Sequence, residues 1–214
     1  MSADAPGAVQ AMPSEGRRFE AIDPARAAGP DRYKLFMGSI VPRPIAFVSS
    51  LNDQGKVNLA PFSNFMAVSA AASLVAFSVG SEARPGEREK DTLHNVRAHG
   101  EFVINLASTD LAAQVQLCSG NYPPEVSEAE EAGLALVPSV TIATPRVAAT
   151  RIQFECRLER IVDFDGPGLV VGKVLLVHAE EGLVRDYKID PLRYAPLARL
   201  GGRIYATLGD LIHV

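Results

Sequence analysis

Residues 45–51 read IAFVSSL, and residues 52–55 (NDQG) and 56–60 (KVNLA) follow them directly. Aliphatic, β-branched and aromatic residues are frequent in the flanking runs, as is typical of strands. The Asn, Asp and Gly between them tolerate the positive φ that a tight turn needs. Together the three pieces predict a β-hairpin, and the rest of the chain repeats its pattern.

Four later segments have the same strand composition: residues 73–79 (SLVAFSV), 101–107 (EFVINLA), 152–162 (IQFECRLERIV) and 169–179 (LVVGKVLLVHA). The turn residues 165–168 (DGPG) between the last two predict a second hairpin. Within residues 152–158, apolar and polar residues alternate, which predicts one buried face and one solvated face. This pattern assigns Cys156 to the core and leaves Gln153, Glu155 and Arg157 in solvent.

Helices are expected to be few and short. Asp91 and Thr92 look like an N-cap for a helix that ends at Gly100, and Asp110 is expected to cap a second segment through Leu117. Strands that follow one another through hairpins favour a mainly antiparallel sheet closed as a barrel over a doubly wound parallel sheet. The length of 214 residues predicts one domain over residues 31–214, preceded by a flexible tail over residues 1–30.

The composition indicates a globular protein, with 47% hydrophobic and 21% charged residues. Its net charge of −4 and pI near 5.6 give no general attraction to nucleic acid or to anionic lipid. Cys118 and Cys156 lie far apart without Cys/His spacing, so they predict buried thiols and neither a disulfide framework nor a zinc site. Residues 1–30 lack the apolar run of a signal peptide and residues 66–79 are too short to span a bilayer, which predicts a cytoplasmic protein without a membrane anchor.

The first motif that could contribute to a binding site is residues 38–50 (GSIVPRPIAFVSS). Pro42 and Pro44 stiffen the backbone at the start of the first strand. The Arg43 guanidinium would therefore be held in a fixed position, which suits binding of a planar anion or ring. The alternative is that the prolines only stop the preceding segment from pairing and that Arg43 is solvated.

The second motif, residues 58–65 (NLAPFSNF), combines small polar groups with a proline and two aromatic residues. Its backbone groups, together with Ser63 and Asn64, could face the polar edge of a heteroaromatic ring. In the alternative interpretation it is a turn whose Phe62 and Phe65 fill the core.

The third motif is residues 90–95 (KDTLHN), where Lys90 and Thr92 lie at a predicted helix N-terminus. Free amides, the positive end of the helix dipole, a cation and a hydroxyl together suit a phosphate. Asp91 would repel a dianion, so its expected role is to cap the helix or to orient Lys90. An ordinary capped surface helix is the alternative.

The spacing of the four histidines does not indicate a metal site. His178, on a predicted strand, has a possible view of a cavity, and we expect a hydrogen-bonded structural residue rather than an acid. His94 and His99 flank a predicted surface helix, and His213 is near the C-terminus.

These motifs, with residues 74–78 (LVAFS), 101–106 (EFVINL) and 197–202 (LARLGG), resemble the flavin reductase-like family, which has the FMN-binding split barrel. The resemblance extends over most of the chain outside the tail and the last few residues. It implies a homodimer in which each split barrel binds one FMN, without a covalent link, near the subunit interface. The implied cofactor-binding residues are Arg43, Pro44, Ser49, Ser50, Asn58, Ala60, Pro61, Phe62, Ser63, Asn64, Lys90, Thr92 and Arg199.

In this interpretation Lys90 and Thr92 hold the 5′-phosphate, while Arg199 belongs to a wall near the C-terminus. The implied activity is NAD(P)H:flavin reduction, in which hydride passes from the nicotinamide to flavin N5, a step that requires no general acid or base; no catalytic residue is assigned. The acceptor is either a small-molecule substrate or the flavin used by a separate monooxygenase component.

Other interpretations stay open at this stage. The same barrel can serve as a non-enzymatic FMN-binding or electron-carrier protein, or as a barrel without flavin. FAD could replace FMN if there is room beyond the phosphate. The choice between NADH and NADPH also stays open, with Arg84, Arg88 and Arg203 as candidates for a 2′-phosphate contact.

Overall fold

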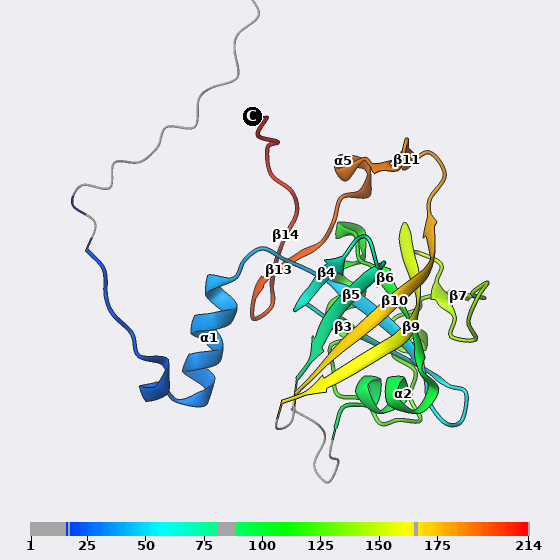
Figure 1. Ribbon diagram of the computed structural model, residues 1–214, viewed down its shortest axis with the longest axis horizontal. Helices are drawn as coiled ribbons and strands as arrows, with labels where there is room; N and C mark the ends of the chain where they lie inside the picture. Colours follow the sequence, from blue (N-terminus) through cyan, green and yellow to red (C-terminus); the bar gives the residue numbers. More distant parts are fainter. Residues whose placement is uncertain (1–15, 17, 81–88, 165–166, 214) are drawn as a thin grey trace, which may run out of the picture.

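A seven-stranded sheet dominates the computed structural model, which describes residues 16, 18–80, 89–164 and 167–213. In spatial order its strands are β3 (Val57–Phe62), β2 (Ala46–Leu51), β6 (Glu101–Leu106), β9 (Ile152–Asp163), β10 (Gly168–Ala179), β5 (Leu74–Val79) and β4 (Phe65–Ser69). Every neighbouring pair in this order is antiparallel. The sheet curls into a barrel (Figure 1).

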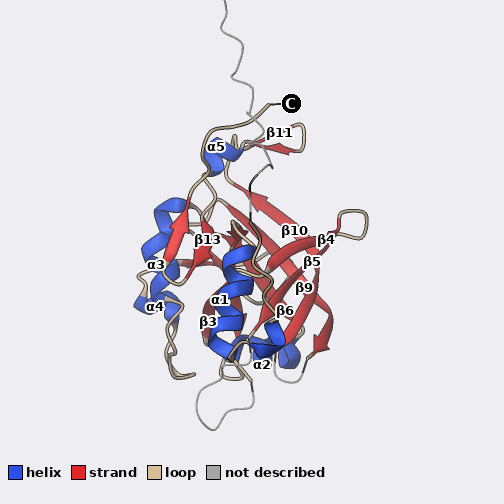
Figure 2. Ribbon diagram, turned by 90° about the vertical axis from the view of Figure 1, so that its left-hand side faces the viewer, coloured by secondary structure: helices blue, strands red, loops and turns tan. Residues whose placement is uncertain are grey.

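Smaller elements surround the barrel. A three-stranded sheet contains β1 (Arg43–Pro44), β13 (Ala198–Gly201) and β14 (Ile204–Ala206), and two short pairs are β7 (Leu136–Val137) with β8 (Arg146–Val147) and β11 (Val184–Arg185) with β12 (Lys188–Ile189). The helices are η1 (Pro24–Arg26), α1 (Gly29–Ser39), α2 (Asp91–His99), η2 (Thr109–Leu111), α3 (Ala112–Leu117), α4 (Glu128–Glu131) and α5 (Pro191–Tyr194). In Figure 2, α3 and α4 lie on one side of the barrel and α2 lies at its lower end.

The predicted strands form, as β2, β3, β5, β6, β9 and β10, and the mainly antiparallel barrel is confirmed. The first hairpin turns at Gly55, whose φ is 76°. Asn52 stabilises this turn, because its side-chain oxygen accepts hydrogen bonds from the amides of Gln54 (3.0 Å) and Lys56 (2.8 Å). The second hairpin pairs β9 with β10, although turn residues 165 and 166 lie outside the described part of the chain. Helix α1 and the short strands β1, β4, β13 and β14 were not predicted.

Strand β2 is buried on both faces, which explains its unbroken apolar run. Ala46 and Val48 belong to a cluster inside the barrel that includes Phe77 and Phe102, each 0% exposed. Phe47 belongs to a second cluster, formed with residues of α3, α4 and the segments around them. Each large apolar side chain buried in this way contributes roughly 1.5–3 kcal/mol to stability. Two cores therefore share β2 as their common wall.

The polar face of β9 is buried at Gln153 and Glu155, so the prediction that these two residues are solvated is wrong, whereas Arg157 farther along the same face is exposed as predicted. The exposed fractions of Gln153 and Glu155 are 6% and 0%. The segment before β9 covers this face, because the amides of Val140 and Thr141 each donate to the Glu155 carboxylate at 2.7 Å. Alternation identified the two faces but could not show that a distant segment covers the polar one. Cys156, on the opposite face, is fully buried as predicted.

The predicted helix caps are only partly correct. Helix α2 ends at Gly100 with φ 69°, as expected, but its N-cap is Lys90 and no side chain caps it within the described residues. Asp110 lies inside η2, where its carboxylate accepts a hydrogen bond from the Ser108 hydroxyl. This bond lowers the pKa of Asp110, and the predicted capping role of Asp110 is wrong.

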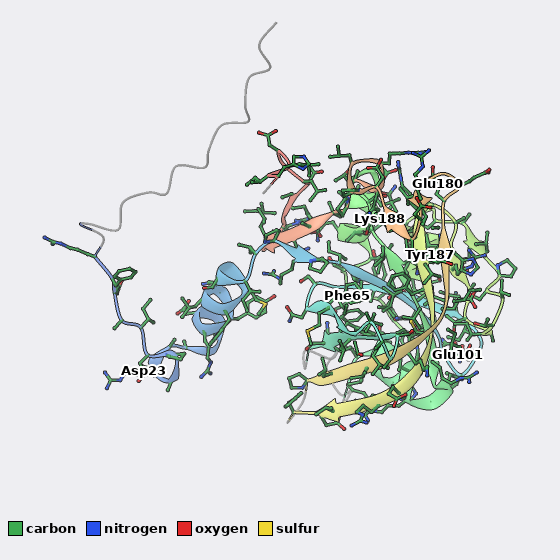
Figure 3. All side chains as sticks on the ribbon, turned by 45° about the horizontal axis from the view of Figure 1, so that its top comes forward. Asp23, Phe65, Glu101, Glu180, Tyr187 and Lys188 are labelled. Carbon is green, nitrogen blue, oxygen red and sulfur yellow. The ribbon has the colours of Figure 1, made fainter. Side chains whose placement is uncertain are left out.

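The N-terminal part of the described chain stands apart from the barrel. Helix α1 buries none of its residues and lies to one side (Figure 1). Asp23 lies still farther from the barrel that carries Phe65 and Glu101 (Figure 3). Residues 1–15 and 17 are outside the described chain, and the division between a tail and a domain at residues 30 and 31 stays a prediction. No described helix is both long and apolar enough to cross a membrane.

Candidate functional site

A small polar network joins β2, β3 and α2. The Asn58 amide donates to the hydroxyl of Thr92 at 2.8 Å and to that of Ser50 at 3.5 Å. Asn95 donates to the same Ser50 oxygen at 3.1 Å. Ser50 and Asn58 are direct cross-strand partners, and Thr92 and Asn95 lie on one side of the helix. The hairpin and the helix are thereby fixed relative to each other.

A cavity of about 100 Å³, which we call the Lys90 cavity, opens beside this network. It brings together six of the predicted binding residues: Asn58, Ala60, Pro61, Phe62, Lys90 and Thr92. Its other lining residues are Asp91, Cys118, Ser119, Gly120, Asn121, Tyr122 and Glu128. The structure thus places the second and third sequence motifs in one site.

The donors in the Lys90 cavity suit an anion. Helix α2 begins here without a side-chain cap among the described residues, and Lys90 adds a positive charge. Thr92 is only 2% exposed, and because its oxygen accepts the bond from Asn58, its hydroxyl proton can be donated to a ligand. The fit to a phosphate therefore rests on a cation, a hydroxyl and a helix N-terminus that face one space.

Glu128 lines the same cavity and has a structural task. Strand β3 is an edge strand, and Glu128 accepts a hydrogen bond from the outward amide of Leu59 at 2.9 Å. Two residues later Pro61 has no amide proton to satisfy, which suits an edge position. Glu128 was not predicted as part of the site, because it lies far from Leu59 and from the predicted site residues in the sequence.

The loop after α3 supplies the wall that the sequence analysis missed. Ser119, Gly120 and Asn121 form a small polar stretch directly after the helix, and such a stretch beside predicted ligand residues could have been a signal. Cys118 begins this wall, and its buried thiol is held in the protonated form. Burial, followed by the negative charge of Glu128, raises its pKa to about 12.

Ser49 lies away from the cavity, although its neighbour Ser50 lies beside it. The Ser49 hydroxyl donates to the carbonyl of Pro145 at 2.7 Å and accepts from Asn105 at 3.3 Å. Consecutive strand residues point to opposite faces, so Ser49 meets the segment that also covers Glu155. The structure gives Ser49 a buried structural position.

Arg43 is buried, with 5% exposed, so the alternative of a solvated side chain is wrong. Its Nη1 donates to the carbonyls of Met37 and Ile40, the latter at 2.6 Å, and its Nε donates to the Ser63 hydroxyl at 3.3 Å. Arg43 thereby fastens the end of α1 to the residue that follows β3. Pro44 and Asn64 are exposed beside this contact.

The aromatic residues of the second motif divide between the two interpretations. Phe62 is 8% exposed and its ring lies 5.1 Å from that of Phe77, so it fills the barrel core while also lining the Lys90 cavity. Phe65 is half-buried at the start of β4 and packs against the same core.

Arg199 belongs to another part of the surface. It lies on β13 directly opposite Arg43, and its guanidinium stacks on Tyr205 at 4.6 Å from the ring centre. Neither Arg199 nor Arg43 lines the Lys90 cavity. The predicted residues therefore form two groups, one around Lys90 and one where β1 meets β13.

His178 has the structural hydrogen bond that the sequence analysis expected. Its Nε2 lies 2.6 Å from Oε1 of Glu155. Burial raises the pKa of Glu155, but bonds from the Thr141 hydroxyl, the Val140 amide and His178 outweigh burial and bring it from 4.5 to about 2. The carboxylate is therefore ionised at neutral pH. Within the described residues no group of His, Cys, Asp or Glu forms a metal cluster.

Known proteins are similar to this chain in sequence and in architecture. The model of the flavin reductase-like domain matches residues 37–199. Nitrilotriacetate monooxygenase component B from Bacillus cereus is 36% identical and superposes with a TM-score of 0.87, over 92% of this chain and all of the other. The 2-nitrobenzoate 2-nitroreductase of Pseudomonas fluorescens is 31% identical, with a TM-score of 0.82 over 91% of this chain and 95% of the other.

A third structure bears on the fold alone. A putative flavin reductase with a split barrel domain from Shewanella frigidimarina is 21% identical, with a TM-score of 0.80 over 93% of this chain and 98% of the other. The seven-stranded antiparallel barrel is thus a split barrel. Since the domain model covers residues 37–199, which include both groups of site residues, the chain belongs to the flavin reductase-like domain family.

Proposed function

We propose that this protein is an FMN-dependent oxidoreductase that transfers hydride from NAD(P)H to the flavin. The observation that carries the proposal is the arrangement of Lys90 and Thr92 at the start of α2, in one cavity with Asn58 and the end of β3. Membership of the flavin reductase-like family supports it. A flavin phosphate would use both the Lys90 cation and the Thr92 hydroxyl proton.

The Lys90 cavity would hold the phosphate end of FMN. Its volume of about 100 Å³ is below the roughly 300–1,000 Å³ of sites that enclose a whole small molecule, so the ring must extend beyond it. The segment from Ala60 to Asn64 leads out of the cavity toward Arg43, and its backbone and side chains would line the ring. A second subunit would cover the ring if the protein is a homodimer, as we propose.

The residues of this chain bind and orient rather than react. Lys90 neutralises phosphate charge, Thr92 donates its hydroxyl proton to the phosphate, and Asn58 holds the Thr92 hydroxyl in place. FMN, when bound, would supply the redox chemistry. Hydride transfer to its N5 requires no acid or base from the protein. Arg43, already bonded through Nε and Nη1, would place positive charge near the ring edge.

The acceptor of the reduced flavin's electrons defines the biological reaction. The similarity to a monooxygenase component supports a role in which reduced flavin passes to a separate oxygenase. The similarity to a nitroreductase supports direct reduction of a small molecule instead. Both belong to the same proposal, because both begin with hydride transfer to flavin.

An absorbance experiment tests the proposal. FMN is added to the purified protein, the excess is removed, and NADH or NADPH is added without air. A retained flavin band that bleaches supports the reductase and identifies the donor. Retained flavin that stays yellow with both donors favours an electron carrier.

Loss of all flavin at this step calls for a turnover assay with FMN in solution, since a reductase can use flavin as a loosely held substrate. Failure of both assays contradicts the proposal.

A further inference from the structure

A chain of hydrogen bonds connects β13 and β14 with the wall of the Lys90 cavity that follows α3. Nη1 of Arg199 donates to the Tyr205 hydroxyl, which donates in turn to Oε1 of Gln116 at 3.1 Å. Nε2 of Gln116 donates to the Ser119 hydroxyl at 2.9 Å. Because Ser119 lines the Lys90 cavity, the chain leads from the group of site residues at β1 and β13 to the group around Lys90.

We propose that Tyr205 is a positioning residue for FMN, whose hydroxyl fixes the place of the phosphate relative to the ring edge. The inference rests on the proposed function, because it needs the phosphate at Lys90 and the ring edge near Arg43. Tyr205 acts through other residues, through Gln116 on the phosphate side and through Arg199 on the ring side.

On the ring side, Tyr205 is in register with the residue proposed to lie at the ring edge. Tyr205 of β14 is opposite Arg199 of β13, and Arg199 is opposite Arg43 of β1. The Tyr205 ring packs against the second core, and the Arg199 guanidinium lies 4.6 Å from the ring centre. A shift of β14 would therefore be transmitted through the strand pairing to β1 and Arg43.

On the phosphate side, Gln116 holds the beginning of the cavity wall. It lies in the last turn of α3, and its carbonyl also accepts a hydrogen bond from the Ser119 hydroxyl at 2.6 Å. Gly120 and Asn121 follow Ser119 and line the Lys90 cavity with it. Figure 2 shows β13 beside α3, so the bond from Tyr205 to Gln116 bridges two neighbouring parts of the fold. Loss of this bond would leave the wall less firmly placed.

The Tyr205 hydroxyl can make both of its bonds only while it keeps its proton. Burial raises the pKa of Tyr205, although the positive charges of Arg199 and Arg203 act in the opposite direction. The hydroxyl is therefore protonated at neutral pH, where it donates to Gln116 and accepts from Arg199. Hydrogen bonds arranged in such a chain strengthen one another, and a cation at one end adds to this effect.

The test measures the dissociation constants of FMN and riboflavin, by flavin fluorescence, for the wild type and Tyr205→Phe. Phenylalanine keeps the ring against the core and beside the Arg199 guanidinium but removes the hydroxyl. We expect FMN to bind about fivefold more weakly, equivalent to about 1 kcal/mol, because both of its ends must be held at the right separation. Riboflavin has no phosphate, so its affinity should change by less than about twofold.

A second substitution at Lys90 gives a readout that a general loss of structure would not change. Lys90→Met has already lost the charge proposed to hold the phosphate. Adding Tyr205→Phe to it should therefore weaken FMN binding by less than about twofold. A loss of about fivefold in this background would show that Tyr205 acts independently of the phosphate, and it would overturn the inference.

Tyr187→Phe is the matched control, because Tyr187 is fully exposed in the turn between β11 and β12 and should leave both affinities unchanged. Should Tyr205→Phe not fold, Gln116→Met breaks the same chain from α3 and should give the same loss for FMN. If the wild type binds FMN but the variant binds it equally well, or loses FMN and riboflavin affinity alike, the inference is overturned and the proposed function stands. If the wild type neither binds nor turns over flavin, the proposed function fails and the inference with it.

Discussion

Ser49 and Ser50 are consecutive residues of β2, yet they belong to two polar networks of different construction. Ser49 faces a closed network in which Asn105 donates to the Phe47 carbonyl and accepts from the Val147 amide. Ser50 faces an open network whose members, Asn58 and Thr92, line the Lys90 cavity. One strand thus separates polar groups that bind the protein's own backbone from polar groups that can bind a ligand.

The charged residues show the same contrast. Glu155 is 0% exposed and receives hydrogen bonds from two amides, a hydroxyl and His178. Lys90 is half-buried at the N-terminus of α2, where no side chain of the described residues caps the helix. A buried charge is tolerated only when its hydrogen bonds are complete, whereas a ligand site must keep some of its donors available. We therefore expect the Glu155 network to determine stability and the Lys90 network to determine flavin binding.

Glu155→Gln should have the largest effect. The substitution removes the negative charge and leaves the Thr141 and Val140 donors with a weaker acceptor, so the free energy of unfolding should fall by about 3 kcal/mol. Urea denaturation measures this change. The matched control is Glu159→Gln on the exposed part of the same strand, which should leave stability nearly unchanged. Equal stability of the two variants would show that the closed network is not a stability element.

Acid should remove the same contribution from the wild type. The pKa of Glu155 is lowered from 4.5 to about 2 in the folded protein, so its ionised form stabilises the fold above pH 4.5. As the pH falls from 4.5 to 2 this contribution, about 3 kcal/mol from the shift, should disappear. Denaturation at several pH values should show the wild type and Glu155→Gln converging in that interval. A constant difference between them would assign the effect of Gln to packing instead of charge.

Lys90→Met should affect binding rather than folding. Loss of the cation should weaken FMN binding by roughly 30-fold, about 2 kcal/mol, and riboflavin binding much less, because riboflavin lacks the phosphate. Lys56→Met is the matched control, since Lys56 pairs with Glu130 at 3.7 Å outside the cavity. Flavin fluorescence measures both affinities. A similar loss for FMN and riboflavin would place Lys90 away from the phosphate.

The contrast between the networks also shows what the sequence could predict. Local patterns identified the hairpin at Gly55, the six main strands and the α2 segment with Lys90 and Thr92, because each depends on residues close together in the chain. Glu128 and the segment over Glu155 escaped prediction because they are brought in by contacts between distant residues, such as that of Glu128 with Leu59. Arg43 was singled out correctly as unusual, but only the fold reveals that it binds the end of α1.

The smallest expected effects come from Ser49→Ala and Ser50→Ala, which test the contrast at neighbouring positions. Ser49→Ala removes a hydrogen bond to the Pro145 carbonyl and should cost about 1 kcal/mol of stability without changing FMN affinity. Ser50→Ala removes the acceptor shared by Asn58 and Asn95, so Asn58 should hold Thr92 less firmly and FMN should bind about threefold to fivefold more weakly. Urea denaturation measures the free energy of unfolding of each variant, and flavin titration measures its FMN dissociation constant. If Ser49→Ala changed flavin affinity as much as Ser50→Ala, the two faces of β2 would be coupled and the closed network would be part of the binding site. If neither substitution changed it, the Ser50 hydroxyl would not be needed to hold Asn58 against Thr92.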